Sequence, residues 1–135
     1  MKKYNALKDG PPDAIILTLP VAFFENRKMD PKIFGGLFEK FLSRHDDGVW
    51  NYRKTTLPTH DVLYVYLIWD GKIQYRTNLV GYERNKSKTF IDSTDGKPRN
   101  FVNANWIILS GPAVKAPHDM PMKGFQGFRY SHKLF

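Results

Sequence analysis

The spacing of hydrophobic residues changes part-way along the chain. Over residues 31–45 the apolar side chains recur at the spacing of one helix face. Asp30 is a suitable N-cap, and Pro31 suits the first helical position. The pattern therefore predicts one main amphipathic helix over 31–45, ending near His45. Its expected buried stripe is Ile33, Phe34, Leu37, Phe38, Phe41 and Leu42.

Short apolar runs and two-residue alternation predict strands on both sides of this helix. The run 14–19 is rich in β-branched residues and stops at Pro20, which favours a buried strand. After the helix, both faces of the segment 62–69 are apolar, so this strand should be central in its sheet. Asp70-Gly71 then predicts a two-residue hairpin turn into a strand over 72–82.

The rest of the chain contains one long polar stretch and two further strands. Residues 83–103 are mostly polar, and we expect 92–98 to form an exposed loop tip. The apolar run 106–109 predicts a buried strand, which Ser-Gly-Pro at 110–112 should stop. A last short strand is predicted over 125–130.

These elements together predict a mainly β (α+β) fold. We expect a mostly antiparallel sheet, closed or nearly closed, with the one main helix after the first strand. A length of 135 residues suits a single domain. Residues 1–12 end in Gly-Pro-Pro and are interpreted as a polar lead-in, with 13–135 as a single β-barrel domain.

Composition adds charge and a compartment to this picture. Lys and Arg number 21 against 13 Asp and Glu, a formal charge of +8 that would attract an anionic partner such as nucleic acid or a nucleotide. Ordinary solvated lysines produce the same excess. The absence of cysteine excludes disulfides, thiol nucleophiles and thiolate zinc sites, and it fits a reducing compartment. We expect a cytoplasmic protein.

One apolar stretch, 14–24, follows several lysines in the manner of a secretion signal. Pro20 interrupts it, and Glu25, Asn26 and Arg27 stand where small residues for cleavage would be needed. The stretch is also too short to span a bilayer. We therefore expect neither secretion nor a membrane partner, and nothing in the sequence sets an oligomeric state.

Motifs of catalysis and metal binding are weak. The four histidines are scattered, with no pair at the helical spacing that places two imidazoles on one metal. No nucleophile elbow and no glycine-rich phosphate loop is present. We predict no metal, no cofactor and no catalytic residues, which favours a protein that is not an enzyme.

The segment 48–54 carries the most suggestive chemistry. It combines flat rings, an amide and two cations, which are the groups that stack on bases, hydrogen-bond their edges and neutralise phosphates. The competing interpretation is a strand end with both rings in the core, and alternation favours it because it sends the rings to one face. The candidate residues are Trp50, Asn51, Tyr52, Arg53 and Lys54.

Two further groups of basic residues are candidates for binding. One set is expected at a single edge of the sheet, beside the loop residues Lys97 and Arg99. The other, Arg129 and Tyr130, repeats the mixture of ring and cation near the end of the chain. The first set consists of Arg76, Arg84, Lys86 and Lys88.

The order of strand, helix, aromatic segment, central strand and hairpin resembles the PUA-like superfamily, and within it the ASCH and EVE branches. The likeness covers roughly residues 14–109 and is carried by Gly-Val-Trp-Asn-Tyr-Arg at 48–53, by 61–66, by 71–73 and by Trp106. It implies a β pseudobarrel whose cleft receives RNA, a modified base or a nucleoside. A base-sized pocket beside residues 50–54 would follow.

The sequence also departs from that pattern. ASCH proteins that act as hydrolases place lysine and glutamate after the glycine, in the order Gly-x-Lys-x-x-Glu-x-Arg. Here Trp50 stands at the lysine position and Arg53 at the glutamate position. The aromatic-Asn-Tyr character looks closer to EVE.

Three functions remain open from the sequence. The first is a non-catalytic module that binds nucleic acid or a nucleotide-like ligand. The second is a hydrolase or nuclease acting on a nucleoside or RNA, with Lys54 paired to Asp61 or Glu83. The third is a protein-interaction domain. A cleft with convergent cations would favour the first, a lysine–carboxylate pair in the cleft the second, and a flat apolar patch the third.

Overall fold

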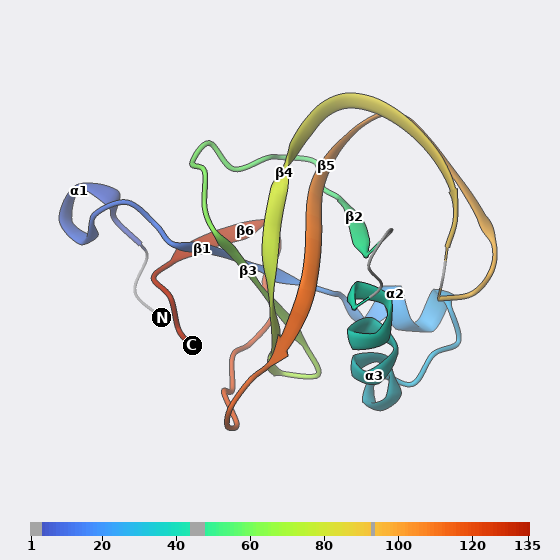
Figure 1. Cartoon of the computed structure of the whole chain (residues 1–135), viewed down its shortest axis with the longest axis horizontal. Helices are drawn as coiled ribbons and strands as arrows, with labels where there is room; N and C mark the ends of the chain where they lie inside the picture. The colour runs from blue at the N-terminus through green and yellow to red at the C-terminus, as the bar shows by residue number, and fades with distance from the viewer. Residues whose placement is uncertain (1–3, 44–47, 93) are drawn as a thin grey trace.

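The computed structural model describes residues 4–43, 48–92 and 94–135, and most of them build one six-stranded sheet (Figure 1). The strand order is β2-β5-β4-β3-β1-β6, and all neighbours are antiparallel except β1 and β3, which are parallel. The mainly β class and the mostly antiparallel pairing are thus confirmed. The strands are β1 (Ala14–Thr18), β2 (Val49–Arg53), β3 (Tyr64–Trp69), β4 (Lys72–Ile91), β5 (Pro98–Lys115) and β6 (Phe128–Ser131).

The sheet is open, so the prediction of a closed or nearly closed barrel is wrong. In the part of the chain that the structure describes, β2 and β6 form the two edges and do not pair with each other. Alternation along each strand identifies the strands, but it does not specify which edges meet, because closure also needs a matched stagger around the whole ring.

Strands β4 and β5 run much further than the sequence predicted. The polar stretch 83–103 was expected to be irregular, yet Glu83 pairs with Trp106 and Ile91 with Pro98 in one continuous ladder. The ladder satisfies the backbone whatever the polarity of the side chains. Over the whole length of β4 and β5 this ladder contains four register shifts. Such bulges bend and twist a pair of strands. We call residues 83–91 and 98–105 the arch, because they curve over and return towards helix α2 (Val21–Asn26) (Figure 1).

The predicted stop at 110–112 is also wrong, because β5 continues to Lys115. Within β5 the peptide bond between Gly111 and Pro112 is cis. A side chain at Gly111 would collide with the carbonyl group of Leu42. Glycine therefore lets β5 pass close to the end of helix α3 (Pro31–Leu42), where a residue with a side chain would have separated the two elements.

The main helix is α3 (Pro31–Leu42), and its start is the one that the sequence predicts. The Asp30 side chain accepts a hydrogen bond from the backbone N–H of Lys32 at 2.9 Å. Within the described residues the helix ends at Leu42; the predicted end near His45 lies in 44–47, outside the described residues. Two shorter helices accompany it, α1 (Ala6–Asp9) and α2 (Val21–Asn26).

The buried stripe of α3 is narrower than predicted. Phe34, Phe38 and Leu42 are buried, whereas Ile33 and Leu37 are 60% and 46% exposed. The sheet is in contact with only one side of the helix, so residues at the margin of the stripe reach solvent. None of the described helices has the length and apolar character needed to cross a membrane.

Both faces of β3 are buried, as predicted for 62–69, but the strand begins at Tyr64, and Leu63 before it is 65% exposed. The larger apolar cluster lies between α3 and the sheet. The smaller one includes Ile16, Tyr66 and Ile73 on the other face, packed against residues of the C-terminal segment such as Met120 and Phe135. The hairpin turn is confirmed, since Asp70 and Gly71 both have positive φ, at 54° and 74°.

Candidate functional site

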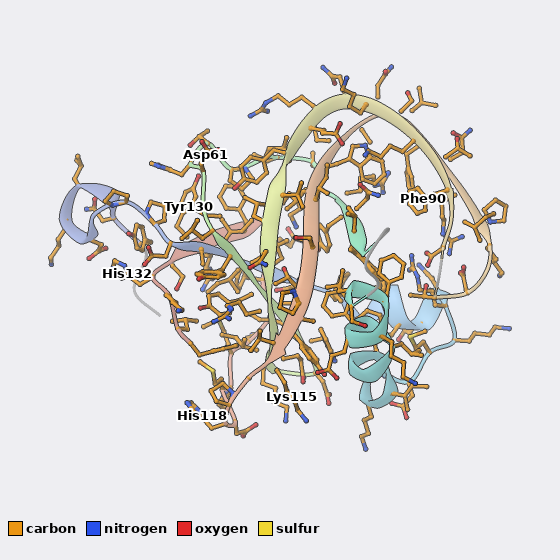
Figure 2. All side chains as sticks on the ribbon, in the orientation of Figure 1. Asp61, Phe90, Lys115, His118, Tyr130 and His132 are labelled. Carbon is orange, nitrogen blue, oxygen red and sulfur yellow. The ribbon has the colours of Figure 1, made fainter. Side chains whose placement is uncertain are left out.

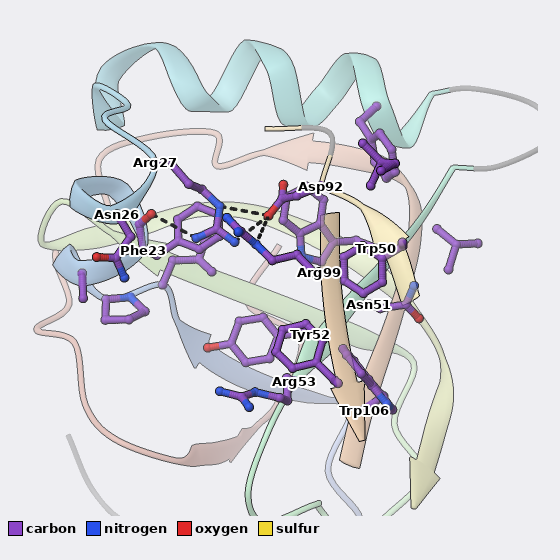
Figure 3. Close-up of a pocket in the computed structure, with 18 residues that line it drawn as sticks. Phe23, Asn26, Arg27, Trp50, Asn51, Tyr52, Arg53, Asp92, Arg99 and Trp106 are labelled. Carbon is purple, nitrogen blue, oxygen red and sulfur yellow. Dashed lines mark hydrogen bonds and ion pairs between the residues drawn. The ribbon is translucent and has the colours of Figure 1, made fainter. Parts of the chain in front are cut away.

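A cleft of about 450 Å³ lies between β2, the arch and α2 (Figure 3). Phe23 and Arg27 line it from the side of α2, and Trp106 lines it from β5. All five residues of β2 contribute, including four of the five that the sequence proposed in 50–54. The arch supplies Phe90, Ile91, Arg99 and Phe101, with Asp92 at its turn.

Trp50 and Tyr52 belong to the core and to the cleft at the same time. Three phenylalanines meet the Trp50 ring edge to face, with centroids at 6.0, 5.5 and 5.6 Å; they are Phe34, Phe38 and Phe41. The Tyr52 hydroxyl donates to the carbonyl of Thr18 at 2.7 Å, and burial raises the pKa of Tyr52 to about 12. Both rings therefore have fixed positions, as alternation predicted, while one side remains open to the cleft.

Asn51 and Arg53 also line the cleft, and they contact the arch. The Arg53 guanidinium lies 4.8 Å from the centroid of the Phe101 ring, and among the described residues it has no acidic partner. The Asn51 Oδ1 atom accepts a hydrogen bond from Lys88 Nζ at 3.1 Å. Lys88 in turn forms an ion pair with Glu83 at 2.7 Å.

Ionic contacts connect the turn of the arch to α2. The Arg27 Nη2 and Asp92 Oδ2 atoms are 2.7 Å apart, and Arg99 Nε lies 3.4 Å from the same oxygen (Figure 3). Burial alone would raise the pKa of Asp92, but hydrogen bonds from Thr94 and Arg27 outweigh it and hold that pKa below its usual range. The prediction of an exposed loop tip is therefore wrong at Asp92, whose side chain is 7% exposed.

Lys54 is the one residue of 50–54 that does not line the cleft. Its backbone N–H donates to the carbonyl of Asn105, and its Nζ lies 5.6 Å from the centroid of the Tyr52 ring. Burial lowers the pKa of Lys54. The pairing that a hydrolase would need is missing from the described residues, because Glu83 contacts Lys88 and no ion pair joins Lys54 to Asp61.

The residues of the first basic set do not lie together in the structure. Arg84 and Lys86 are exposed on the arch, and Lys88 is turned towards Asn51. Arg76 lies elsewhere: its guanidinium is 4.7 Å from the centroid of the Tyr64 ring and donates to the carbonyl of Phe135. Of the two loop residues expected beside this set, Lys97 is exposed and Arg99 lines the cleft.

The second candidate pair lies at the opposite edge of the sheet. Arg129 and Tyr130 belong to β6, and Tyr130 is far from Phe90 of the arch in Figure 2. The Arg129 guanidinium covers the Phe125 ring at 4.1 Å. The Tyr130 hydroxyl accepts from the backbone N–H of Thr59 at 2.9 Å. The contacts of both residues lie at the β6 edge of the sheet, and neither residue lines the cleft.

Sequence reasoning did not identify the half of the cleft that α2 and the arch contribute. The sequence did not single out Phe23 and Arg27 as site residues. Phe90, Asp92 and Phe101 lie in a stretch that was interpreted as polar and irregular. One signal was available, namely the two aromatic residues that flank the turn at 90 and 101. Rings on either side of a turn are typical of cross-strand pairs, and their centroids are in fact 6.0 Å apart.

No protein-family model, no curated protein and no solved structure matches this chain. The described residues also contain no group of three or more histidine, aspartate or glutamate side chains that could hold a metal ion.

Proposed function

We propose that this protein is a nucleic-acid-binding module that receives one unpaired base in the cleft beside β2. The observation that carries the proposal is the joint presence of rings, an amide and a guanidinium in a single cleft of about 450 Å³. Clefts of this size hold small ligands. Those side-chain types stack on bases, bind their edges and neutralise phosphates.

The rigidity of the rings supports a stacking role. Trp50 is fixed by three phenylalanines and Tyr52 by its bond to Thr18, so neither ring loses much freedom when a ligand arrives. Arg53 supplies a cation that no described carboxylate neutralises. Arg84 and Lys86 on the arch and the net charge of +8 would attract the phosphate backbone.

The PUA-like relationship is part of the same proposal. The cleft beside residues 50–53 occupies the place where that resemblance implies a base-sized pocket. The open sheet departs from the pseudobarrel that the resemblance implies.

Binding to single-stranded oligonucleotides tests the proposal, with Arg53→Gln as the decisive variant. Arg129→Gln is a matched control, since Arg129 also covers a phenylalanine ring but lies on the opposite edge. We expect Arg53→Gln to melt like the wild type and to lose about tenfold in affinity, because a charged contact to the ligand is removed. If both variants bind every oligonucleotide and nucleoside as the wild type does, the cleft is not the binding site.

The salt dependence of the same binding tests the role of the arch. Replacing Arg84 and Lys86 together with glutamine should weaken binding to all sequences. It should also lower the slope of log affinity against log salt by about 1.4, since each phosphate contact on a single strand contributes about 0.7. An unchanged slope would assign the two residues to solubility alone.

A further inference from the structure

The orientation of the Asn51 amide is set by its neighbour on the arch. Lys88 Nζ carries only donors, so the atom that faces it at 3.1 Å is the Asn51 oxygen. The Asn51 Nδ2 group, with its two N–H donors, has no acceptor among the described residues. Because Asn51 lines the cleft, Nδ2 is the group that remains for a ligand.

Lys88 is itself held in place. Its Nζ forms the ion pair with Glu83 at 2.7 Å and lies 5.7 Å from the centroid of the Trp106 ring, and its side chain is only 24% exposed. Turning the Asn51 amide over would place its NH₂ group against the ammonium of Lys88 and break their hydrogen bond. The donor orientation of Asn51 is therefore fixed before a ligand binds.

The next polar residue on the β2 wall of the cleft also offers only donors. Arg53 follows Asn51 by two residues on one side of the strand, a spacing of about 7 Å. The Tyr52 hydroxyl is already engaged, because it donates a hydrogen bond to the carbonyl of Thr18 at 2.7 Å. Asn26, the other amide of the cleft, is exposed and has no described partner, so it can turn to suit either a donor or an acceptor.

The acidic groups near the cleft are already engaged. Asp92 accepts hydrogen bonds from Arg27, and Asp95 forms an ion pair with Arg99. The four hydrogen bonds that the Asp92 carboxylate can accept come from Arg27 and Thr94, and each oxygen of Asp95 accepts one from Lys97 or Arg99.

We propose that the cleft selects keto bases, guanine first and uracil second, over adenine and cytosine. The inference rests on the function proposed above. Guanine presents two adjacent acceptors, O6 and N7, to which arginine and other donors bind, whereas adenine and cytosine present amino groups that need an acceptor. A free asparagine amide reads adenine by offering both its oxygen and its NH₂ group. Here Lys88 takes one lone pair of that oxygen and holds the oxygen towards the arch, so Lys88 is the residue that positions the Asn51 NH₂ group for keto bases.

Titration with the four nucleoside 5′-monophosphates tests this selectivity, because all four carry the same phosphate charge. We expect the wild type to bind GMP about tenfold more tightly than AMP, with UMP above CMP. Lys88→Met should bring the GMP-to-AMP ratio close to one, since the Asn51 amide is then free to turn. Lys88→Arg, which keeps a donor-only cation, should preserve the ratio. Lys40→Met, at an exposed position of α3 that does not line the cleft, is the control and should also preserve it.

A second variant keeps the test decisive if Lys88→Met does not fold. In Asn51→Asp one carboxylate oxygen would face Lys88 and the other would offer an acceptor, so the preference should move towards AMP. Equal binding of all four nucleotides by the wild type would overturn the inference and leave the proposed function standing. If no nucleotide and no oligonucleotide binds, the proposed function falls and the selectivity falls with it.

Discussion

The body of the sheet and the arch are continuous through β4 and β5, but different interactions stabilise them. In the body, β1 and β3 bury nearly every side chain between α3 and the C-terminal segment. In the arch, the outer parts of β4 and β5 alternate between exposed and partly buried residues. Ion pairs of Arg27 and Arg99 with Asp92 tie its turn to α2. Burial thus stabilises the body, whereas the cleft is shaped both by polar contacts and by the packing of Phe90 and Phe101 against Trp106.

The largest difference between the two regions is expected in the free energy of unfolding, when one isoleucine in each region is replaced by alanine. Ile15 is 0% exposed in β1, and Ile91 is 65% exposed at the end of the arch. We expect Ile15→Ala to lower the free energy of unfolding by about 3–4 kcal/mol, because it removes buried methyl groups and leaves a cavity. Ile91→Ala should cost less than about 1 kcal/mol. Urea unfolding measures both, and equal losses would mean that the arch is also held by apolar burial.

A smaller but more local effect is expected at the turn of the arch. Asp92→Asn removes the charge that Arg27 contacts in a nearly buried position, which should cost about 2 kcal/mol. Asp119→Asn is the matched control, because Asp119 pairs with Lys72 on the surface, where such pairs contribute about 0–1 kcal/mol. Amide hydrogen exchange should quicken in the arch and stay unchanged in β1 and β3. Faster exchange spread evenly over the sheet would show that the ion pairs do not act on the arch alone.

Lowering the pH should gradually remove the stability that the charge of Asp92 contributes. Because the pKa of Asp92 is lowered in the folded chain, its ionised form stabilises the fold above the unfolded pKa of about 3.9. This stability is lost as the pH falls below that value through the lower, folded pKa. The difference in unfolding free energy between wild type and Asp92→Asn should stay constant from pH 7 to about pH 5 and shrink below about pH 4. A difference that persists unchanged at pH 2.5 would mean that the charge of Asp92 does not stabilise the protein.

The sequence predicted the elements that depend on neighbouring residues. Asp30 and Pro31 start a helix by capping its own backbone, and Asp70-Gly71 closes a hairpin between adjacent strands. The contribution of β2 to the cleft could also be predicted, because two rings, an amide and a cation stand together in 50–53.

The arch could not be predicted from neighbouring residues. Its strands are polar on much of both faces, so no apolar alternation marks them, and their pairing depends on the partner strand. Arg27 and Asp92 are in contact although 65 positions separate them in the sequence. A local sequence pattern does not predict a contact between residues so far apart. The exposure of Ile33 and Leu37 has the same origin, because the width of the sheet beneath α3 is a tertiary property.

The most direct test of the central claim is the NMR spectrum of ¹⁵N-labelled protein during titration with a single-stranded RNA. A base in the cleft should shift the indole N–H signal of Trp50, the side-chain amide of Asn51 and the guanidinium N–H of Arg53. It should leave the backbone signals of Arg129 and Tyr130 on the opposite edge unchanged. Shifts confined to β6, or spectra that do not change at saturating RNA, would contradict the account.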